Sequence, residues 1–220
     1  MREDWSEVEL GEIAKIYNGN SINEKVKEEK YKTCKTGLNY IGTKDVNFDG
    51  IINYKNGVKI PHNEPKFKIA PKGCVIVCSE GGSAGRKTGY VDESIYFGNK
   101  LFAITNEYSI FEGKYVYYYT RYHKFFEAFK DQMNGIIGGV SARKFSNIII
   151  PFSPLPIQKA IVKKIEELFS SLDSGIADLK KAQEQLVIYR QAVLKKAFEG
   201  ELTKDWREKQ SDLPSANELL

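Results

Sequence analysis

The residues best suited to chemistry form a glycine-rich loop, SEGGSAGRKTG (79–89), which follows the apolar run GCVIVC (73–78). A phosphate-binding loop of an ATPase has the pattern G-x-x-x-x-G-K-[ST]. The glycine before its lysine lets backbone N–H groups curl around a phosphate. When Lys87 and Thr88 are aligned with the end of this pattern, Arg86 stands where that glycine is required. The sequence therefore does not favour ATP binding.

Two other interpretations of this loop stay open. The segments on both sides of it are rich in branched and aromatic residues, which favours a strand, loop, strand order over a strand, loop, helix order. The loop can be an ordinary glycine-rich hairpin turn. Alternatively, its small residues can bring the backbone close to a nucleic-acid phosphate, while Arg86 and Lys87 supply positive charge.

The remaining reactive residue types indicate neither catalysis nor metal binding. The two histidines, His62 and His123, lack the neighbours of a zinc site or of a nucleophile and base pair. Cys74 and Cys78 lie in the apolar run and are interpreted as buried hydrophobic residues. The carboxylates show no nuclease pattern, and the sequence lacks an adenine methyltransferase signature. We expect no enzyme activity, no cofactor and no metal.

Positive charge is concentrated in the first part of the chain. Residues 1–153 hold 22 basic and 18 acidic residues, whereas residues 154–220 hold 11 of each. Between residues 54 and 90 there are seven basic residues and two acidic ones. Such a surplus suits a polyanionic partner such as a nucleic acid, although solvated surface lysines are its commoner cause.

The sequence changes character near residue 153. Before it, short strand-like runs alternate with Gly, Asn, Asp and Pro, which predicts a mixed sheet with irregular connections. One helix is expected within KYVYYYTRYHKFFEAFK (114–130), because aromatic residues recur there at three- and four-residue spacing, namely Tyr115, Tyr118, Tyr122, Phe125 and Phe129. Such a stripe is typical of a core-facing side; stacking on exposed bases is the alternative.

After the prolines of PFSPLP (151–156), the sequence predicts one helix that continues to Glu199, on the order of 65 Å long. Its apolar residues recur every seven positions, which predicts a coiled-coil seam that needs a partner. We assign to this seam Ile165, Phe169, Leu172, Ile176, Leu179, Leu186 and Val193, with Val162 also on this side.

The fold class expected is therefore α+β, with a mixed-sheet domain followed by one long coiled-coil helix. The expected boundaries are 1–153 for the globular domain, 154–200 for the helix and 201–220 for a polar tail. The sequence has no run of 18 apolar residues and no charged-then-apolar leader. We expect no membrane association and a cytoplasmic location.

Five segments, taken in order, resemble the specificity subunit of type I restriction-modification systems. They are WSEVELGEIAKIYNG, NYIGTKDVNFDG, GCVIVCSEGGSAGRKTGYV, GGVSARKFSNIIIPFSPLPIQKAIVKKIEELFSSLD and YRQAVLKKAFEGELTKDWR. The resemblance covers nearly the whole chain. One departure is the helix entry SPLPIQ, where the family more typically has consecutive prolines and an acidic residue before the glutamine.

The resemblance implies a non-catalytic target-recognition domain that reads a half-site of double-stranded DNA, followed by a spacer helix. The family's usual chain carries two of each, with the helices packed antiparallel, so this sequence looks like a half-length form. The implied partners are a second copy in an antiparallel homodimer, a methyltransferase subunit and possibly a restriction subunit. Two identical domains on a two-fold axis would read an interrupted palindrome. A coiled-coil adaptor with a protein- or RNA-binding globular domain is the alternative.

Candidate DNA contacts follow from charge, polarity and loop position. For phosphates we predict Ser83, Gly85, Arg86 and Lys87, and further Lys44, Arg143 and Lys144. For bases we predict Asn20, Ser21 and Asn134, which lie in polar stretches expected to be loops.

Overall fold

The computed structural model describes residues 5–133 and 138–219. The chain divides into two compact units, Met1–Lys164 and Ile165–Leu220. The boundary expected at residue 153 lies just before helix α6 (Leu155–Phe198), whereas the first unit ends at Lys164 and includes the first turns of α6. These turns belong to the first unit because Gln158 and Val162 are buried in it.

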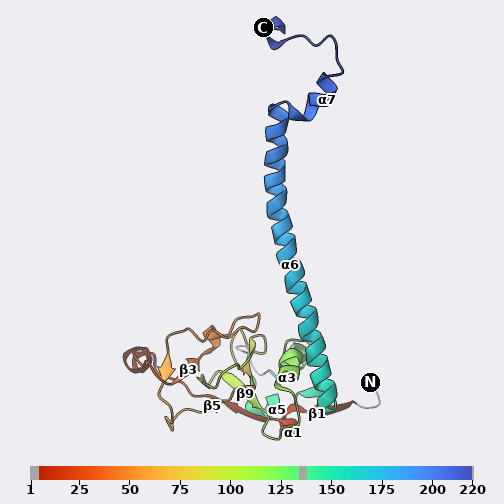
Figure 1. Ribbon diagram of the computed structural model, residues 1–220. Helices are drawn as coiled ribbons and strands as arrows, with labels where there is room; N and C mark the ends of the chain where they lie inside the picture. The colour runs from red at the N-terminus through yellow and green to blue at the C-terminus, as the bar shows by residue number, and fades with distance from the viewer. Residues whose placement is uncertain (1–4, 134–137, 220) are drawn as a thin grey trace. The chain divides into compact units, whose positions relative to one another are not determined.

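The described residues of the first unit form three sheets (Figure 1). The smallest is an antiparallel pair, β1 (Ser6–Glu9) with β10 (Ile149–Phe152). The second has the antiparallel order β2 (Lys15–Asn18), β9 (Leu101–Thr105), β6 (Val75–Cys78), β7 (Thr88–Tyr90). The third has the order β4 (Lys59–Ile60), β3 (Leu38–Ile41), β8 (Ile95–Phe97), β5 (Ile69–Ala70), and β3 pairs with β8 in parallel. The α+β class and the mixed sheet are thus confirmed.

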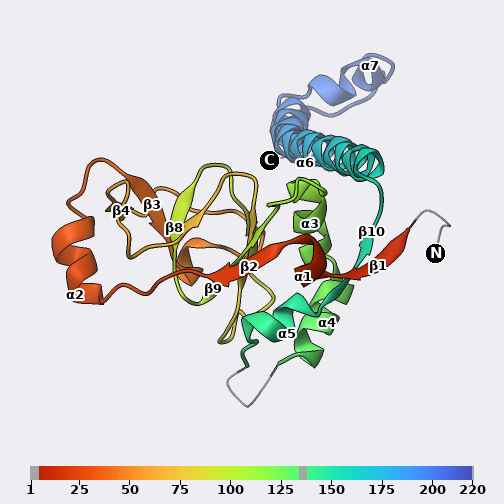
Figure 2. The ribbon, with the colours of Figure 1, turned by 90° about the horizontal axis from the view of Figure 1, so that it is seen from below.

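Short helices complete the first unit: α1 (Leu10–Ile13), α2 (Glu24–Val26), η1 (Lys27–Tyr31), η2 (Thr43–Asp45), α3 (Gly113–Thr120), α4 (His123–Asp131) and α5 (Ala142–Ser146). Figure 2 shows α3, α4 and α5 towards one end of this unit and α2 with β3 and β4 towards the other. Beyond α6, the second unit contains η3 (Glu201–Thr203), α7 (Lys204–Arg207) and α8 (Ala216–Leu219).

Strand β6 is buried on both faces, which explains the unbroken apolar run in the sequence. Val75 and Val77 belong to the core that also contains side chains from α3, α4 and α5. Cys74, Ile76 and Cys78 belong to a second core, shared with residues of the other four-stranded sheet. Cys74 and Cys78 are buried hydrophobic residues, as predicted, and burial raises the pKa of Cys74 to about 12.

The prediction of a single helix between residues 114 and 130 is wrong. The chain forms α3 and α4 instead, separated by Arg121 and by Tyr122, which is extended with ψ 140°. Phe125 and Phe129 face the core, as the predicted stripe requires. Tyr122, placed in the same stripe, is 45% exposed because the break between the helices takes it off that face.

In the second unit, α6 exposes its predicted apolar seam. Phe169, Leu172, Ile176, Leu179 and Leu186 are each between 43% and 72% exposed in the single chain. Ile165 and Val193 are half-buried. Val162, which the sevenfold pattern placed on the same side, instead packs into the core of the first unit.

Candidate nucleic-acid interface

The loop between β6 and β7 is a hairpin connection with a defined internal structure. Val77 pairs with Thr88, and the backbone N–H of Cys78 donates to the Lys87 carbonyl at 2.9 Å. The N–H groups of Arg86 and Lys87 both donate to the Ser83 carbonyl, at 3.0 and 3.2 Å. The strand, loop, strand order lacks the following helix of an ATP-binding loop, as the sequence indicated.

Gly85, which was predicted to contact a phosphate, shapes this loop, and its own N–H is used inside the loop. Its φ is +68°, and a Cβ built on it would lie 2.5 Å from Phe129 Cδ1 in α4. Gly85 is buried, and its N–H donates to the Cys78 carbonyl at 2.8 Å. Glycine is required here because it allows both the left-handed backbone and the close approach to α4.

The two cations of the loop flank an exposed aromatic ring from a distant part of the chain. The Arg86 guanidinium and the Lys87 ammonium each lie 5.2 Å from the ring centroid of Phe48, which is 52% exposed. Lys87 Nζ also donates to the Thr43 carbonyl at 3.2 Å. The loop therefore presents positive charge around an apolar surface, in positions fixed by contacts with residues 43–48.

A third cation reaches the same place from the end of α3. Arg121 Nη1 donates to the Phe48 carbonyl at 3.3 Å, and its guanidinium lies 5.8 Å from the ring centroid of Tyr117. A shallow pocket of about 290 Å³ lies beside Phe48 and Arg86 and is also lined by Arg121 and His123. We call Phe48, Arg86, Lys87 and Arg121 the cationic cluster.

Sequence reasoning missed Phe48 and Arg121. The only local signal for Phe48 is an aromatic residue inside the turn-forming stretch NFDG, where a core residue is not expected. For Arg121 no local signal exists, because only the fold brings the end of α3 to this loop.

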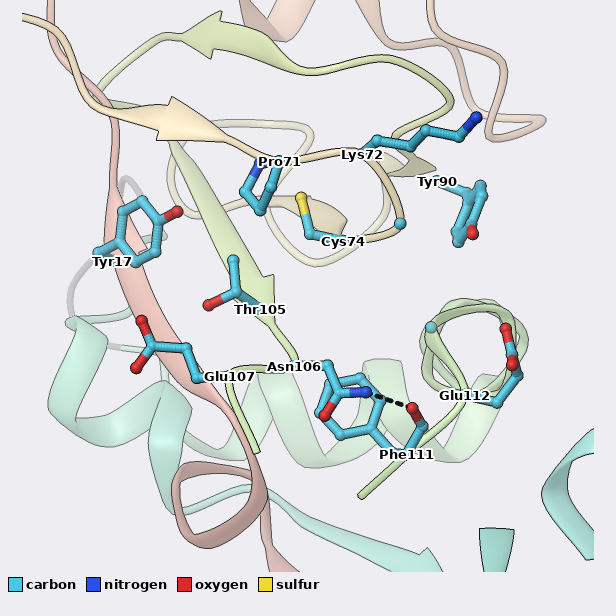
Figure 3. Close-up of a pocket in the computed structure, with 12 residues that line it drawn as sticks. Tyr17, Pro71, Lys72, Cys74, Tyr90, Thr105, Asn106, Glu107, Phe111 and Glu112 are labelled. Atoms are coloured by element: carbon cyan, nitrogen blue, oxygen red, sulfur yellow. Dashed lines mark hydrogen bonds between the residues drawn. The ribbon is translucent and has the colours of Figure 1, made fainter. Parts of the chain in front are cut away.

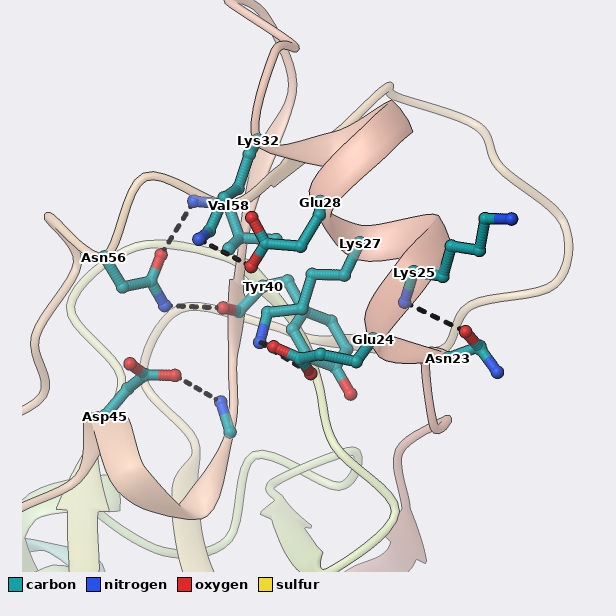
Figure 4. A network of polar contacts seen from close by, with 11 residues as sticks. Asn23, Glu24, Lys25, Lys27, Glu28, Lys32, Tyr40, Asp45, Asn56 and Val58 are labelled. Atoms are coloured by element: carbon teal, nitrogen blue, oxygen red, sulfur yellow. Dashed lines mark hydrogen bonds and ion pairs between the residues drawn. The ribbon is translucent and has the colours of Figure 1, made fainter.

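Lys44 lies close to the cationic cluster along the chain, as an exposed residue of the turn η2 next to Thr43. Within this turn the Asp45 carboxylate accepts the Gly42 N–H at 2.8 Å (Figure 4). In the same view, the buried Lys27 ammonium lies 3.1 Å from Glu24 Oε1. The predicted phosphate residues Lys44, Arg86 and Lys87 therefore come from adjacent segments.

The motif GGVSARKF also lies beside the loop. The Gly81 N–H donates to the Gly138 carbonyl at 2.9 Å, and the Val140 N–H donates to the Ser79 carbonyl at 3.0 Å. Helix α5, which carries Arg143 and Lys144, begins two residues after Val140. Arg143 is exposed, Lys144 is half-buried, and Ser83 is half-buried in the loop itself.

The residues predicted for base contacts lie in different structural environments. Asn20 has a structural role, because its Oδ1 accepts the Lys68 N–H at 2.9 Å and its carbonyl accepts the Tyr40 hydroxyl at 2.8 Å. Its carbonyl and side-chain oxygens are thus used in the fold, and its role as a base contact stays a prediction. Ser21 is exposed. Asn134 lies outside the described residues.

A larger pocket, of about 520 Å³, lies between β2, the segment just before β6, the end of β9 and the start of α3 (Figure 3). Its side chains include Tyr17, Cys74 and Glu107. Burial raises the pKa of both Tyr17 and Cys74 to about 12, so both are protonated at neutral pH. Glu107 pairs with Lys15 at 2.6 Å. The described residues of this pocket thus include no activated nucleophile.

Within residues 5–133 and 138–219, no group of three or more His, Cys, Asp or Glu side chains is arranged to hold a metal ion. In the same part of the chain, no helix has both the length and the apolar character that crossing a bilayer requires.

The first turns of α6 are held in the first unit by the buried side-chain amide of Gln158. Gln158 is fully buried; its Oε1 accepts the Glu112 N–H at 2.9 Å, and its Nε2 donates to the Ser153 carbonyl at 2.6 Å. Both ends of the side chain are satisfied, so the amide fixes the first turns of α6 against the segment before α3. This contact explains the glutamine in the SPLPIQ entry to the helix.

The architecture defined so far is an α+β domain followed by a long helix, and proteins of known structure share it. The HsdS subunit from Thermoanaerobacter tengcongensis superposes with a TM-score of 0.62 at 23% identity, over 91% of this chain and 46% of that chain. The chain itself belongs to the family of the type I restriction modification DNA specificity domain, whose model matches residues 2–184.

Two curated relatives from Escherichia coli agree with this membership. The type I restriction enzyme EcoKI specificity subunit (strain K12) is 30% identical over 156 residues, which cover 68% of this chain and 33% of that subunit. The EcoBI specificity subunit is 24% identical over 208 residues, covering 93% of this chain and 41% of that subunit. The chain thus spans less than half the length of these relatives.

Proposed function

We propose that this chain is a DNA-recognition component of a type I restriction-modification complex and that its globular unit reads one half-site of double-stranded DNA. The observation that carries this proposal is the cationic cluster in a member of this family: Arg86 and Lys87 lie against the exposed Phe48 ring, and Arg121 donates to the Phe48 carbonyl. Positive side chains at such a site neutralise phosphates, and this neutralisation gives affinity without sequence preference.

The proposed phosphate contacts are Arg86, Lys87 and Arg121, with Lys44, Arg143, Lys144 and Ser83 around them. Sequence must then be read by side chains that reach the base edges, since phosphate contacts carry no sequence information. Ser21 stays a candidate for this role because it is exposed in a loop.

We further propose that the seam of α6 is covered by the antiparallel helix of a second copy. Support comes from the exposed apolar residues at sevenfold spacing, which bury little surface within the single chain. A two-fold axis between antiparallel helices would place two identical globular units on two inverted half-sites. The relevant site would then be an interrupted palindrome.

In this proposal the chain is not an enzyme and carries no cofactor. A methyltransferase subunit would supply methyl transfer, and a restriction subunit would supply cleavage; both would dock on the recognition component. A cytoplasmic location would follow from the proposed DNA partner.

Selection from a random library tests the half-site proposal. Purified chain, together with its methyltransferase subunit, is incubated with random-sequence duplex DNA, and the retained duplexes are sequenced. Enrichment of one bipartite motif with inverted halves is the expected result. Retention without enrichment, or preferential retention of RNA in a parallel selection, would contradict the proposal and favour an adaptor with a different ligand.

A further inference from the structure

The residues around Phe48 form a tight hairpin turn that is held at several points. Val46 and Ile52 form an antiparallel bridge, and the Asn53 N–H donates to the Asp45 carbonyl at 2.7 Å. Inside the turn, Asn47 Oδ1 accepts the Ile51 N–H at 2.8 Å. We call residues 45–53 the Phe48 hairpin.

The Phe48 hairpin is also anchored to the body of the first unit. Gly50 has a φ of +85°, and a Cβ built on it would lie 2.3 Å from the Tyr117 hydroxyl and 2.5 Å from Arg121 Nη1. Arg121 in turn donates to the Phe48 carbonyl. These contacts fix the backbone that carries Phe48, so little conformational freedom is left to lose when the ring contacts a ligand.

A half-exposed aromatic ring on such a fixed turn is costly in water and contributes little to the core. Phe48 is 52% exposed and belongs to none of the three hydrophobic cores. Two cations lie near its ring, Arg86 and Lys87, on the loop that we propose contacts DNA phosphates. An apolar side chain between cations matches a DNA strand, in which stacked bases lie next to charged phosphates.

Resting on the proposed function, we infer that Phe48 is a wedge residue that stacks against a base and opens one base step of the half-site. Arg86 and Lys87 hold the phosphates next to that step, and Arg121 holds the backbone of the Phe48 hairpin in place. Apolar side chains inserted at a step partly unstack the bases and kink the duplex, which makes binding depend on how easily that step deforms. Phe48 therefore determines specificity through DNA deformability.

The test uses the full chain with its methyltransferase subunit and a duplex that carries the motif recovered by selection. 2-Aminopurine replaces one base at a time, at positions other than the methylated adenine, because its fluorescence rises when a base loses its stacking partner. With the wild-type chain, fluorescence is expected to rise at one step in each half-site. Phe48→Ala should abolish this rise and weaken binding of the motif about tenfold to a hundredfold.

Two further variants separate a wedge from a structural effect. Phe48→Trp keeps a flat ring and should retain the fluorescence rise. Tyr108→Ala removes another exposed ring, 65% exposed on a separate loop, and should leave both fluorescence and affinity unchanged. The salt dependence of binding should stay unchanged in Phe48→Ala, because no phosphate contact is lost.

The outcomes distinguish this inference from the proposed function. If the wild-type chain selects a motif and Phe48→Ala binds it with unchanged affinity and fluorescence, the wedge is overturned and the proposed function stands. If the wild-type chain selects no motif, the proposed function fails and the wedge fails with it.

Discussion

Gly85 and Phe129 are in such close contact that any side chain at position 85 would collide with the ring: a Cβ there would lie 2.5 Å from Phe129 Cδ1. This contact joins the β6–β7 loop to α4. It fixes the backbone that carries Arg86 and Lys87, and so links the packing of the core to the position of the cationic cluster.

Replacing Gly85 with alanine should therefore destabilise the first unit. The change adds a methyl group against Phe129 and places a non-glycine residue at a φ of +68°. Overpacking of this kind typically costs about 1–3 kcal/mol. Gly82→Ala in the same loop is the matched control, because a Cβ there meets nothing within 4 Å. Urea unfolding of both variants checks the prediction, and equal stabilities would contradict it.

Removal of the loop cations should weaken binding to all DNA sequences by a similar factor, because phosphate contacts carry no sequence information. Arg86→Ala and Lys87→Ala should each reduce the slope of log affinity against log salt by about 1, since each is proposed to neutralise about one phosphate. Lys15→Ala is the control, because that ammonium is paired with Glu107 at 2.6 Å. Fluorescence anisotropy over a salt series gives the slopes. A slope unchanged in both loop variants would remove these residues from the interface.

Gln158→Leu should lower the free energy of unfolding by removing the contacts that hold the first turns of α6 in the first unit. The substitution preserves the apolar stem but leaves the Glu112 N–H and the Ser153 carbonyl without their partner. Each unsatisfied buried group costs about 1–3 kcal/mol. Gln191→Leu, at an exposed position of the same helix, should change the free energy of unfolding by less than about 0.5 kcal/mol. Thermal unfolding compares the two, and a Gln158→Leu chain as stable as the control would show that these turns are held by other contacts.

A charge placed in the seam of α6 should separate the proposed homodimer. Leu179 is 72% exposed in the single chain, so Leu179→Lys should leave the monomer folded while burying an unpaired charge between helices. Light scattering should then give 25.0 kDa instead of about 50 kDa, twice the chain mass. Lys181→Glu, two residues away on another side of the helix, should stay dimeric. A wild-type chain that is monomeric at all concentrations would count against pairing with itself.

The buried thiol of Cys74 should make the fold sensitive to alkaline pH. Burial raises its pKa from the ordinary 9.0 to about 12, so between these values the folded chain keeps a proton that the unfolded chain releases. The stability from this group is complete below pH 9 and is lost as the pH rises towards 12, by up to about 1.4 kcal/mol per pH unit. Cys74→Ala should make this decline shallower without removing it, because burial also raises the pKa of Cys78 and of Tyr17. Cys34→Ala, at a half-buried thiol, is the control variant. Urea unfolding at several pH values between 8 and 11 measures both slopes.

The features predicted correctly from the sequence are those with a local signal. The run GCVIVC and the flanking branched residues are enough to predict a buried strand followed by a hairpin loop. Sevenfold spacing is enough to predict α6 and the exposure of its seam, because periodicity is a property of a single helix.

The features that were missed or wrong depend on contacts between distant segments. Phe48 and Arg86 are 38 positions apart, and neither position alone indicates that they meet. Asn20 was chosen for its polarity alone, and nothing near position 20 indicates that its side-chain oxygen accepts the Lys68 N–H. The break at Tyr122 leaves the aromatic spacing intact, so the periodicity could not reveal it. Val162 has the sevenfold spacing of the seam, but it packs into the core of the first unit. Spacing alone does not distinguish these two environments.

The most direct test of the central claim is long-read mapping of adenine methylation in cells that express the methyltransferase subunit with and without this chain. We predict a bipartite motif with inverted halves that is methylated only when the chain is present, and that is lost when Arg86 and Lys87 are both replaced by alanine. Methylation that is identical with and without the chain would contradict the claim that this protein selects the DNA sequence.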